Sequence, residues 1–375
     1  MARPPKRLLA SPARPTVRSR DRLRRWKATT APYSGLVQHP IFDDLRIRLA
    51  CDAFALSTDA GPGLRKFMLF CDIFRIQERE RCPASFGLIC SFAMWMTLKP
   101  EEGEHWGVPT ETVGVATAKN YLGNVYTWHT VQGFARPCSP AQEKQIRSLM
   151  KGAARTQDPR HTRTKRPPVM LPDLRLLREN LALEDPFDAA VWAASLTAFF
   201  GLARLGEVTV RTSGIYNSAT HPSRSDFATA IAADGLHFAT LRLPWAKTMD
   251  VFKREDQWLI LAPQAEEFDP LSAVANHLEI NNLPPTAHAF AWTDNSGVAR
   301  PLTRSAMLNR LHRAWHQNPT RLFGHSFRIG GSSFLLARGQ TPETVKLVGR
   351  WKSLAFHTYL RSIEQALADR LAFLA

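Results

Sequence analysis

The residues best suited to chemistry lie in the second half of the chain, in short blocks with regular spacing. His325 and Arg328 are three residues apart in the stretch GHSFR, so a helix would place them on one face. Trp351 follows in the block GRW, and Tyr359 lies eight residues beyond it. Guanidinium groups bind phosphate oxygens, imidazole exchanges protons, and a phenol can act as a nucleophile. Together these residue types could bind an anion, exchange protons and supply a nucleophile.

Three further residues lie upstream of these blocks. Arg204 and Glu207 are three apart in RLGE, directly after a long apolar stretch. Lys247 lies in a polar segment between two expected strands, near Lys253 and Arg254. Each has a simpler interpretation when taken singly: an arginine after an apolar helix can cap it, and a lysine in a turn is usually solvated. The signal comes from all of them occurring together in one order.

These blocks resemble the tyrosine recombinases, the phage-integrase family of enzymes that break and rejoin DNA. The spacing in the last blocks is most similar to the Cre-type members, and the Arg- and Pro-rich N-terminus favours a Crypton-type mobile element of a eukaryote. The resemblance implies a nuclear protein, with the bacterial cytoplasm or nucleoid as the alternative. It also implies the following catalytic residues: Arg204, Lys247, His325, Arg328, Trp351 and Tyr359.

The resemblance assigns a role to each residue. Arg204 and Arg328 would bind the two non-bridging oxygens of the phosphodiester and stabilise the charge of the transition state. Tyr359 would attack phosphorus and form a 3′-phosphotyrosine intermediate. His325 would exchange protons in the site, and Lys247 would protonate the departing 5′ oxygen.

Two supporting roles and the partners follow from the same resemblance. Trp351 has an indole N–H that can only donate, so we expect it to buttress the site and contact the phosphate. Glu207 would orient the histidine or an arginine. The mechanism needs no cofactor, metal or ATP. The partner is double-stranded DNA, bound by a homo-tetramer that is a monomer or dimer when free, and no membrane is involved.

The elements that must position these residues predict a mainly α chain of the α+β class. We expect an N-terminal helical core-binding bundle, then a mixed, mostly helical catalytic domain with a small antiparallel sheet. Apolar residues at helical spacing fill 41–155, and alternating residues at 236–243 and 258–261 predict a hairpin. The stretch 189–203 predicts a buried core helix, because it is too short to cross a bilayer.

The charge pattern sets the expected domain boundaries. The net charge is +16, and residues 1–30 alone carry ten Lys and Arg against one Asp. Residues 151–168 carry six more against one acid. We therefore expect these parts: a disordered basic tail at 1–35, a helical DNA core-binding domain at 36–150, a basic linker at 151–172 and a recombinase catalytic domain at 173–375. Such basic runs commonly bind the phosphate backbone of nucleic acid.

Several classes of protein are excluded by what the sequence lacks. It has no P-loop, no GxSxG or HExxH motif, and no CxxC pair among its five cysteines. The cluster Glu101, Glu102, Glu104 and His105 is better explained as a solvated acidic patch than as a metal site. Two alternatives to a recombinase stay open. One is a domesticated, recombinase-derived DNA-binding protein without catalysis, and the other is a type IB-like topoisomerase that relaxes supercoils.

Overall fold

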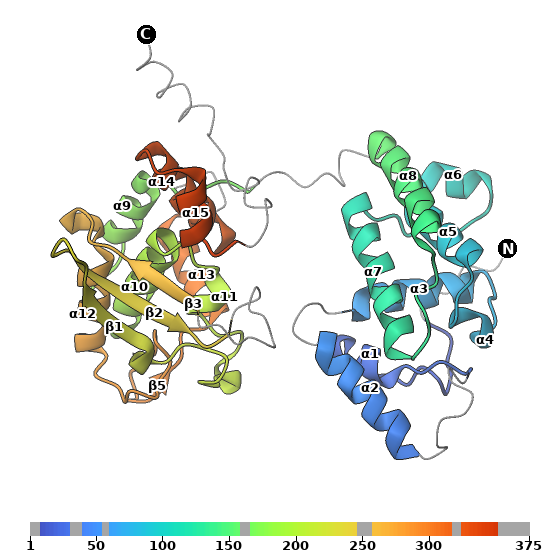
Figure 1. Cartoon of the computed structure of the whole chain (residues 1–375), viewed down its shortest axis with the longest axis horizontal. Helices are drawn as coiled ribbons and strands as arrows, with labels where there is room; N and C mark the ends of the chain where they lie inside the picture. The colour runs from blue at the N-terminus through green and yellow to red at the C-terminus, as the bar shows by residue number, and fades with distance from the viewer. Residues whose placement is uncertain are drawn as a thin grey trace, which may run out of the picture. The chain divides into compact units, whose positions relative to one another are not determined.

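The computed structural model describes residues 8–30, 40–54, 60–157, 166–245, 257–316 and 324–351 (Figure 1). The chain forms two compact units, residues 1–164 and 165–375. The first is helical, and the second combines helices with a small antiparallel sheet. The predicted fold class is therefore confirmed. None of the described helices is long and apolar enough to span a membrane.

The first unit is a bundle of helices around an aromatic core. Phe67, Phe92 and Trp128 are among its fully buried side chains, and α3 packs against α7 while α5 packs against α8. Its helices are α1 (Arg22–Arg25), α2 (Pro40–Phe54), α3 (Gly61–Ile73), α4 (Glu78–Arg81), α5 (Phe86–Trp95), α6 (Pro100–His105), α7 (Val115–Val131) and α8 (Pro140–Thr156).

The prediction of a disordered tail at 1–35 is wrong for residues 8–30, which we call the basic strap. Its buried Trp26 and Leu23 belong to the core of the bundle, and Arg14 is buried against acidic side chains of α3 and α4. The tail was predicted from its lack of periodicity, but the strap is held by contacts to distant residues. Residues 1–7 and 31–35 lie outside the described part of the chain.

The predicted linker at 151–172 is also shorter than expected. Helix α8 continues to Thr156, because Ser139 caps its start and Ile146 and Met150 bury one face. Val169 is fully buried in the second unit, where its N–H donates to the carbonyl of Ser326 at 2.9 Å. Of the expected linker, residues 158–165 are outside the described part.

The second unit is built around α10 (Pro186–Phe200), which is buried on nearly every side. Asp185 caps its N-terminus by accepting from the N–H groups of Phe187 and Asp188. Helix α10 packs against α12, α14 and strand β3 (Figure 1). The other helices are α9 (Leu171–Glu179), α11 (Leu205–Val208), α12 (Pro270–Ile280), α13 (Arg304–Ala314), α14 (Gly324–Ala337) and α15 (Pro342–Val348).

The sheet contains the predicted hairpin and one strand that was not predicted. Its order is β1–β2–β3, all antiparallel, with β1 (Phe227–Ile231), β2 (His237–Leu243) and β3 (Gln257–Leu261). Leu241 pairs with Leu259, and both are buried beneath the sheet. Strand β1 gave no signal because it lies at the edge with most of its residues exposed. A separate two-stranded ribbon joins β4 (Trp292–Thr293) to β5 (Ala299–Arg300).

Candidate active site

The end of α10 delivers Arg204 to the site. The chain leaves the helix through Leu202, whose φ of 47° is left-handed, and turns into the short helix α11. The backbone N–H of Arg204 donates to Oε2 of Glu207 at 2.8 Å, while its guanidinium donates to Oε1 at 2.7 Å. The three-residue spacing thus places a carboxylate where it fixes the arginine at both ends. The Arg204 side chain keeps 22% of its surface exposed, so it can still meet a ligand.

Helix α14 carries His325 and Arg328 and is pressed against two other segments. A Cβ atom added to Gly330 would lie 1.8 Å from the carbonyl oxygen of Val169, and one added to Gly331 would lie 2.0 Å from that of Phe199. Only glycine allows backbones to approach this closely. The GG pair of the sequence therefore serves the close packing that places His325 and Arg328.

Arg328 has no exposed surface. Its two terminal nitrogens donate to the carbonyl oxygens of Leu202 and Gly349. The ring of Trp351 covers the guanidinium, with 4.0 Å from the Arg328 carbon Cζ to the ring centroid. The Arg328 guanidinium is thus not exposed at the surface, where the predicted contact with a phosphate oxygen would form. Arg328 instead ties the end of α10 to the turn that carries Trp351.

The structure adds Arg350, which the sequence analysis did not include. Its guanidinium donates to Oε2 of Glu207 at 2.8 Å, so one carboxylate holds both Arg204 and Arg350. Arg350 has a left-handed φ of 57° between Gly349 and Trp351. Strained backbone at non-glycine residues is often found at functional sites. The only signal in the sequence was its position inside the block GRW, since its partner is 143 residues away.

The cluster carries an excess of positive charge. Three arginines (Arg204, Arg328 and Arg350) surround one acid, Glu207, so the four groups sum to +2 when all are ionised. Burial alone would raise the pKa of Glu207, but Arg350 and Arg204 more than offset it, and its pKa lies below the ordinary value. The carboxylate therefore stays ionised and cancels only one of the three charges. Such a site favours an anionic ligand.

His325 lies within the field of four arginines. Its pKa falls to about 4, chiefly because burial disfavours the charged ring, and then because Arg166, Arg328, Arg204 and Arg304 repel a further proton. The imidazole is therefore neutral at pH 7 and can accept a proton. Arg166 and Arg304, both exposed, were not predicted as site residues. Arg304 begins α13, and its N–H donates at 2.8 Å to the carbonyl of Val210, two residues after the end of α11.

The structure brings together five of the seven predicted residues, Arg204, Glu207, His325, Arg328 and Trp351. Their electrostatic and direct contacts link them in one cluster. Lys247 and Tyr359 lie outside the described residues, so their positions stay predictions. Among the described residues, no group of three or more His, Cys, Asp or Glu is arranged to hold a metal ion.

Comparison with solved structures identifies similar folds. The XerH site-specific recombinase, bound to palindromic difH substrate in a post-cleavage complex, has a TM-score of 0.51 at 12% identity, over 94% of this chain and 94% of that one. The Tn1549 transposon integrase in complex with transposon right end DNA has a TM-score of 0.47 at 12% identity, over 88% of this chain and 99% of that one. No family model and no curated protein matches the sequence. The likeness to XerH is one of fold.

Proposed function

We propose that this chain, which has the fold of the tyrosine recombinases, is a site-specific DNA recombinase or integrase of a mobile element. The observation that carries the proposal is the excess positive charge around Glu207, next to a neutral His325. A phosphodiester supplies the missing negative charge, and its neighbours in duplex DNA supply more. The order and spacing of the sequence blocks agree with this chemistry.

Arg204 is the group that contacts the scissile phosphate. Its guanidinium is permanently charged, partly exposed, and held in one orientation by Glu207. It binds a non-bridging oxygen and stabilises the additional charge that develops when phosphorus becomes pentacoordinate. Arg328 and Arg350 act from beneath, as buried positive charges that raise the local potential without leaving their protein partners.

The reaction proceeds through a covalent intermediate. The phenolic oxygen of Tyr359 attacks phosphorus, the bond to the 5′ oxygen breaks, and a 3′-phosphotyrosine ester forms. Neutral His325 accepts the phenolic proton, and Lys247 gives a proton to the departing 5′ oxygen. The 5′ hydroxyl of a second DNA strand then attacks the ester and gives its proton to Lys247, while the bond to Tyr359 breaks and its oxygen takes the proton back from His325. The roles of Tyr359 and Lys247 come from the family resemblance.

The energy of the broken bond is kept in the phosphotyrosine ester, so the proposed reaction consumes no ATP. The charge of the transition state is met by guanidinium groups, and the proposal includes no metal. Trp351 covers Arg328 and supports it, and a contact of its indole with the phosphate remains part of the proposal. The partner is duplex DNA, bound by a tetramer on two sites, and the site of action is the nucleus.

The test is a search for the covalent adduct. Duplexes bound by the full chain are selected from a randomised pool and resynthesised with a nick beside each candidate phosphate, so that the cleaved fragment diffuses away. Incubation with EDTA and without ATP should give a protein–DNA band on a denaturing gel. Tyr359→Phe should abolish that band, whereas Tyr216→Phe, a half-buried tyrosine that donates to the carbonyl of Thr286, should retain it.

Other outcomes separate the alternatives. Binding of the selected duplexes with no adduct at any nick would falsify the catalytic proposal and favour a recombinase-derived DNA-binding protein. Relaxation of supercoiled plasmid by the wild-type chain, without preference for the selected sequence, would favour a type IB-like topoisomerase.

A further inference from the structure

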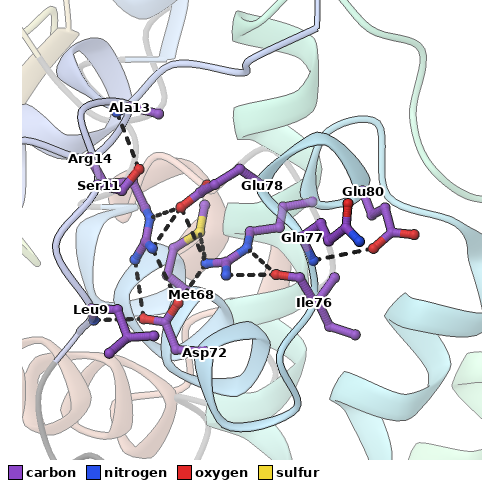
Figure 2. A network of polar contacts seen from close by, with 11 residues as sticks. Leu9, Ser11, Ala13, Arg14, Met68, Asp72, Ile76, Gln77, Glu78 and Glu80 are labelled. Atoms are coloured by element: carbon purple, nitrogen blue, oxygen red, sulfur yellow. Dashed lines mark hydrogen bonds and ion pairs between the residues drawn. The ribbon is translucent and has the colours of Figure 1, made fainter.

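The basic strap, residues 8–30, is fixed to the helical bundle by a buried ion network. Figure 2 shows Arg14 reaching the carboxylates of Asp72 and Glu78, with distances of 3.1 and 2.7 Å from its Nη2. Arg81 meets the same Asp72 at 2.8 Å, and the N–H of Leu9 donates to it at 3.0 Å. Two arginines and two acids balance each other, so this network leaves no net charge.

A second anchor lies at the other end of the strap. Trp26 is 3% exposed, and its carbonyl oxygen accepts from Nε1 of Trp128 at 3.0 Å and from Gln132 at 3.2 Å. The N–H of Ala28 donates to the same Gln132 side chain at 2.9 Å. Arg22 donates to the carbonyl of Gly61 at 2.9 Å. The strap is thus held at both ends and in the middle.

The residues of the strap that take no part in these anchors include several arginines and a lysine that face the solvent. Their side chains are exposed, and none of the ion pairs among the described residues uses Arg18, Arg24, Arg25 or Lys27. Arg24 and Arg25 line two adjoining hollows, one shared with Arg18 and the other with Lys27. Asp21 and Asp44 border these hollows, and Arg20 lies 4.0 Å from Asp21. The five cations (Arg18, Arg20, Arg24, Arg25 and Lys27) outnumber the two acids by three.

We infer that this surface is a preformed binding site for the phosphate backbone of duplex DNA, separate from the catalytic cluster. The inference rests on the proposed function, because DNA is the polyanion that function requires. A membrane surface fits less well, since Leu23 of α1 and Trp26, which directly follows α1, are buried, and the exposed Leu9 lies outside both hollows. Because the strap is already folded, its cations meet DNA without the ordering cost that a disordered tail would incur.

The test compares two double variants of the full chain that remove equal charge. Arg24→Gln/Arg25→Gln alters the strap, and Arg79→Gln/Lys144→Gln removes two exposed cations of α4 and α8. Binding to a labelled duplex of arbitrary sequence is followed by fluorescence anisotropy over a range of salt. The strap variant should bind roughly tenfold more weakly, and the slope of log K against log salt should become shallower by about 1.8, for two phosphates lost. In the control variant, the losses of affinity and of salt slope should each be at most about a third of those in the strap variant.

Three outcomes would count against the inference. Equal losses in both variants would show that only total charge matters, and no change in the strap variant would show that DNA does not touch it. Weaker binding to phosphatidylserine vesicles with unchanged binding to duplex would assign the surface to membranes. Covalent cleavage is scored separately at saturating DNA. If the strap variant loses affinity while the wild type forms no adduct, the binding surface stands and the recombinase proposal fails. If the wild type forms adducts and the strap variant leaves the slope of log K against log salt unchanged, the recombinase proposal stands and the inference about the strap fails.

Discussion

Each unit contains a buried cluster of arginines and carboxylates, and the two clusters differ in charge. In the helical unit, Arg14 and Arg81 face Asp72 and Glu78, so positive and negative groups are equal in number. In the second unit, Arg204 and Arg350 bind the single carboxylate of Glu207, and the buried Arg328 adds a third positive charge nearby. Only the second cluster is left with uncompensated charge.

This difference separates a structural clamp from the proposed binding site. In a balanced network each charged group is paired with a group of opposite charge within the protein. The network therefore needs no external ion and can hold two segments together permanently. A cluster with surplus positive charge is less stable by itself and gains free energy when an anion arrives. The comparison predicts that mutations in the first cluster affect folding, and those in the second affect binding and catalysis.

The largest expected effect is on stability. Asp72→Asn removes the carboxylate that meets Arg14, Arg81 and the N–H of Leu9, and leaves two buried arginines undercompensated. We expect the helical unit to lose about 3–5 kcal/mol of unfolding free energy. Chemical denaturation measures this unfolding free energy, and the substitution of an exposed acid, Glu104→Gln, serves as the control. A loss below about 1 kcal/mol would mean that the clamp does not hold the strap.

The next effect is on chemistry. Arg204→Gln keeps Glu207 paired with Arg350, so stability should change by about 1 kcal/mol or less, the usual range for a partly exposed ion pair. Cleavage of the nicked duplex should slow by about 10²–10³-fold, because the accessible cation at the phosphate is lost. Single-turnover rates decide the point, with the exposed Arg313→Gln as control. If Arg204→Gln instead lost several kcal/mol of stability while its folded fraction kept the wild-type cleavage rate, the second cluster would be the structural one.

The two units should also differ in their response to acid. Burial lowers the pKa of His277 to about 4 and that of His288 to about 3, so both are neutral in the folded state. Their unfolded pKa of about 6.5 lies above these values, so protons bind the unfolded chain first as pH falls. Stability is therefore full above pH 6.5 and is lost as pH falls from about 6.5 to about 4 for His277 and to about 3 for His288, by roughly 3 kcal/mol or more for each histidine.

Hydrogen exchange followed by mass spectrometry, corrected for the intrinsic effect of pH, should show this loss. Peptides from α10 and α12 should lose protection between pH 7 and pH 5. Peptides from α3 and α7 should lose less, although burial also lowers the pKa of His129 on α7. Greater loss in the helical unit would contradict the assignment of these neutral histidines.

The smallest effect is a direct test of the surplus charge. Inorganic phosphate at about 50 mM should stabilise the second unit by about 2 kcal/mol if it binds the cluster with a millimolar Kd. Sodium chloride at equal ionic strength corrects for screening, and the helical unit corrects for general salting effects. The gain should disappear in Arg204→Gln. Equal stabilisation of both units by phosphate would show that the cluster has no anion site.

The sequence was sufficient for features set by local pattern. Helical periodicity and alternation predicted α3, α5, α7, α10 and the β2–β3 hairpin, and the spacing of His325 and Arg328 predicted a shared helix. It was insufficient where partners are far apart in the chain. Arg14 meets Asp72 from 58 residues away and Arg350 meets Glu207 from 143 residues away. Spacing also shows which face Arg328 occupies but not that this face is buried.

The glycines of α14 make the site sensitive at a distance. Gly330 and Gly331 rest on the backbone oxygens of Val169 and Phe199, so one methyl group at either position would push the helix outward. In an enzyme, a misplacement near 1 Å can cost about a hundredfold in rate. If the proposed function holds, a substitution at either glycine would therefore displace His325 and Arg328 together, although every side chain of the cluster is kept.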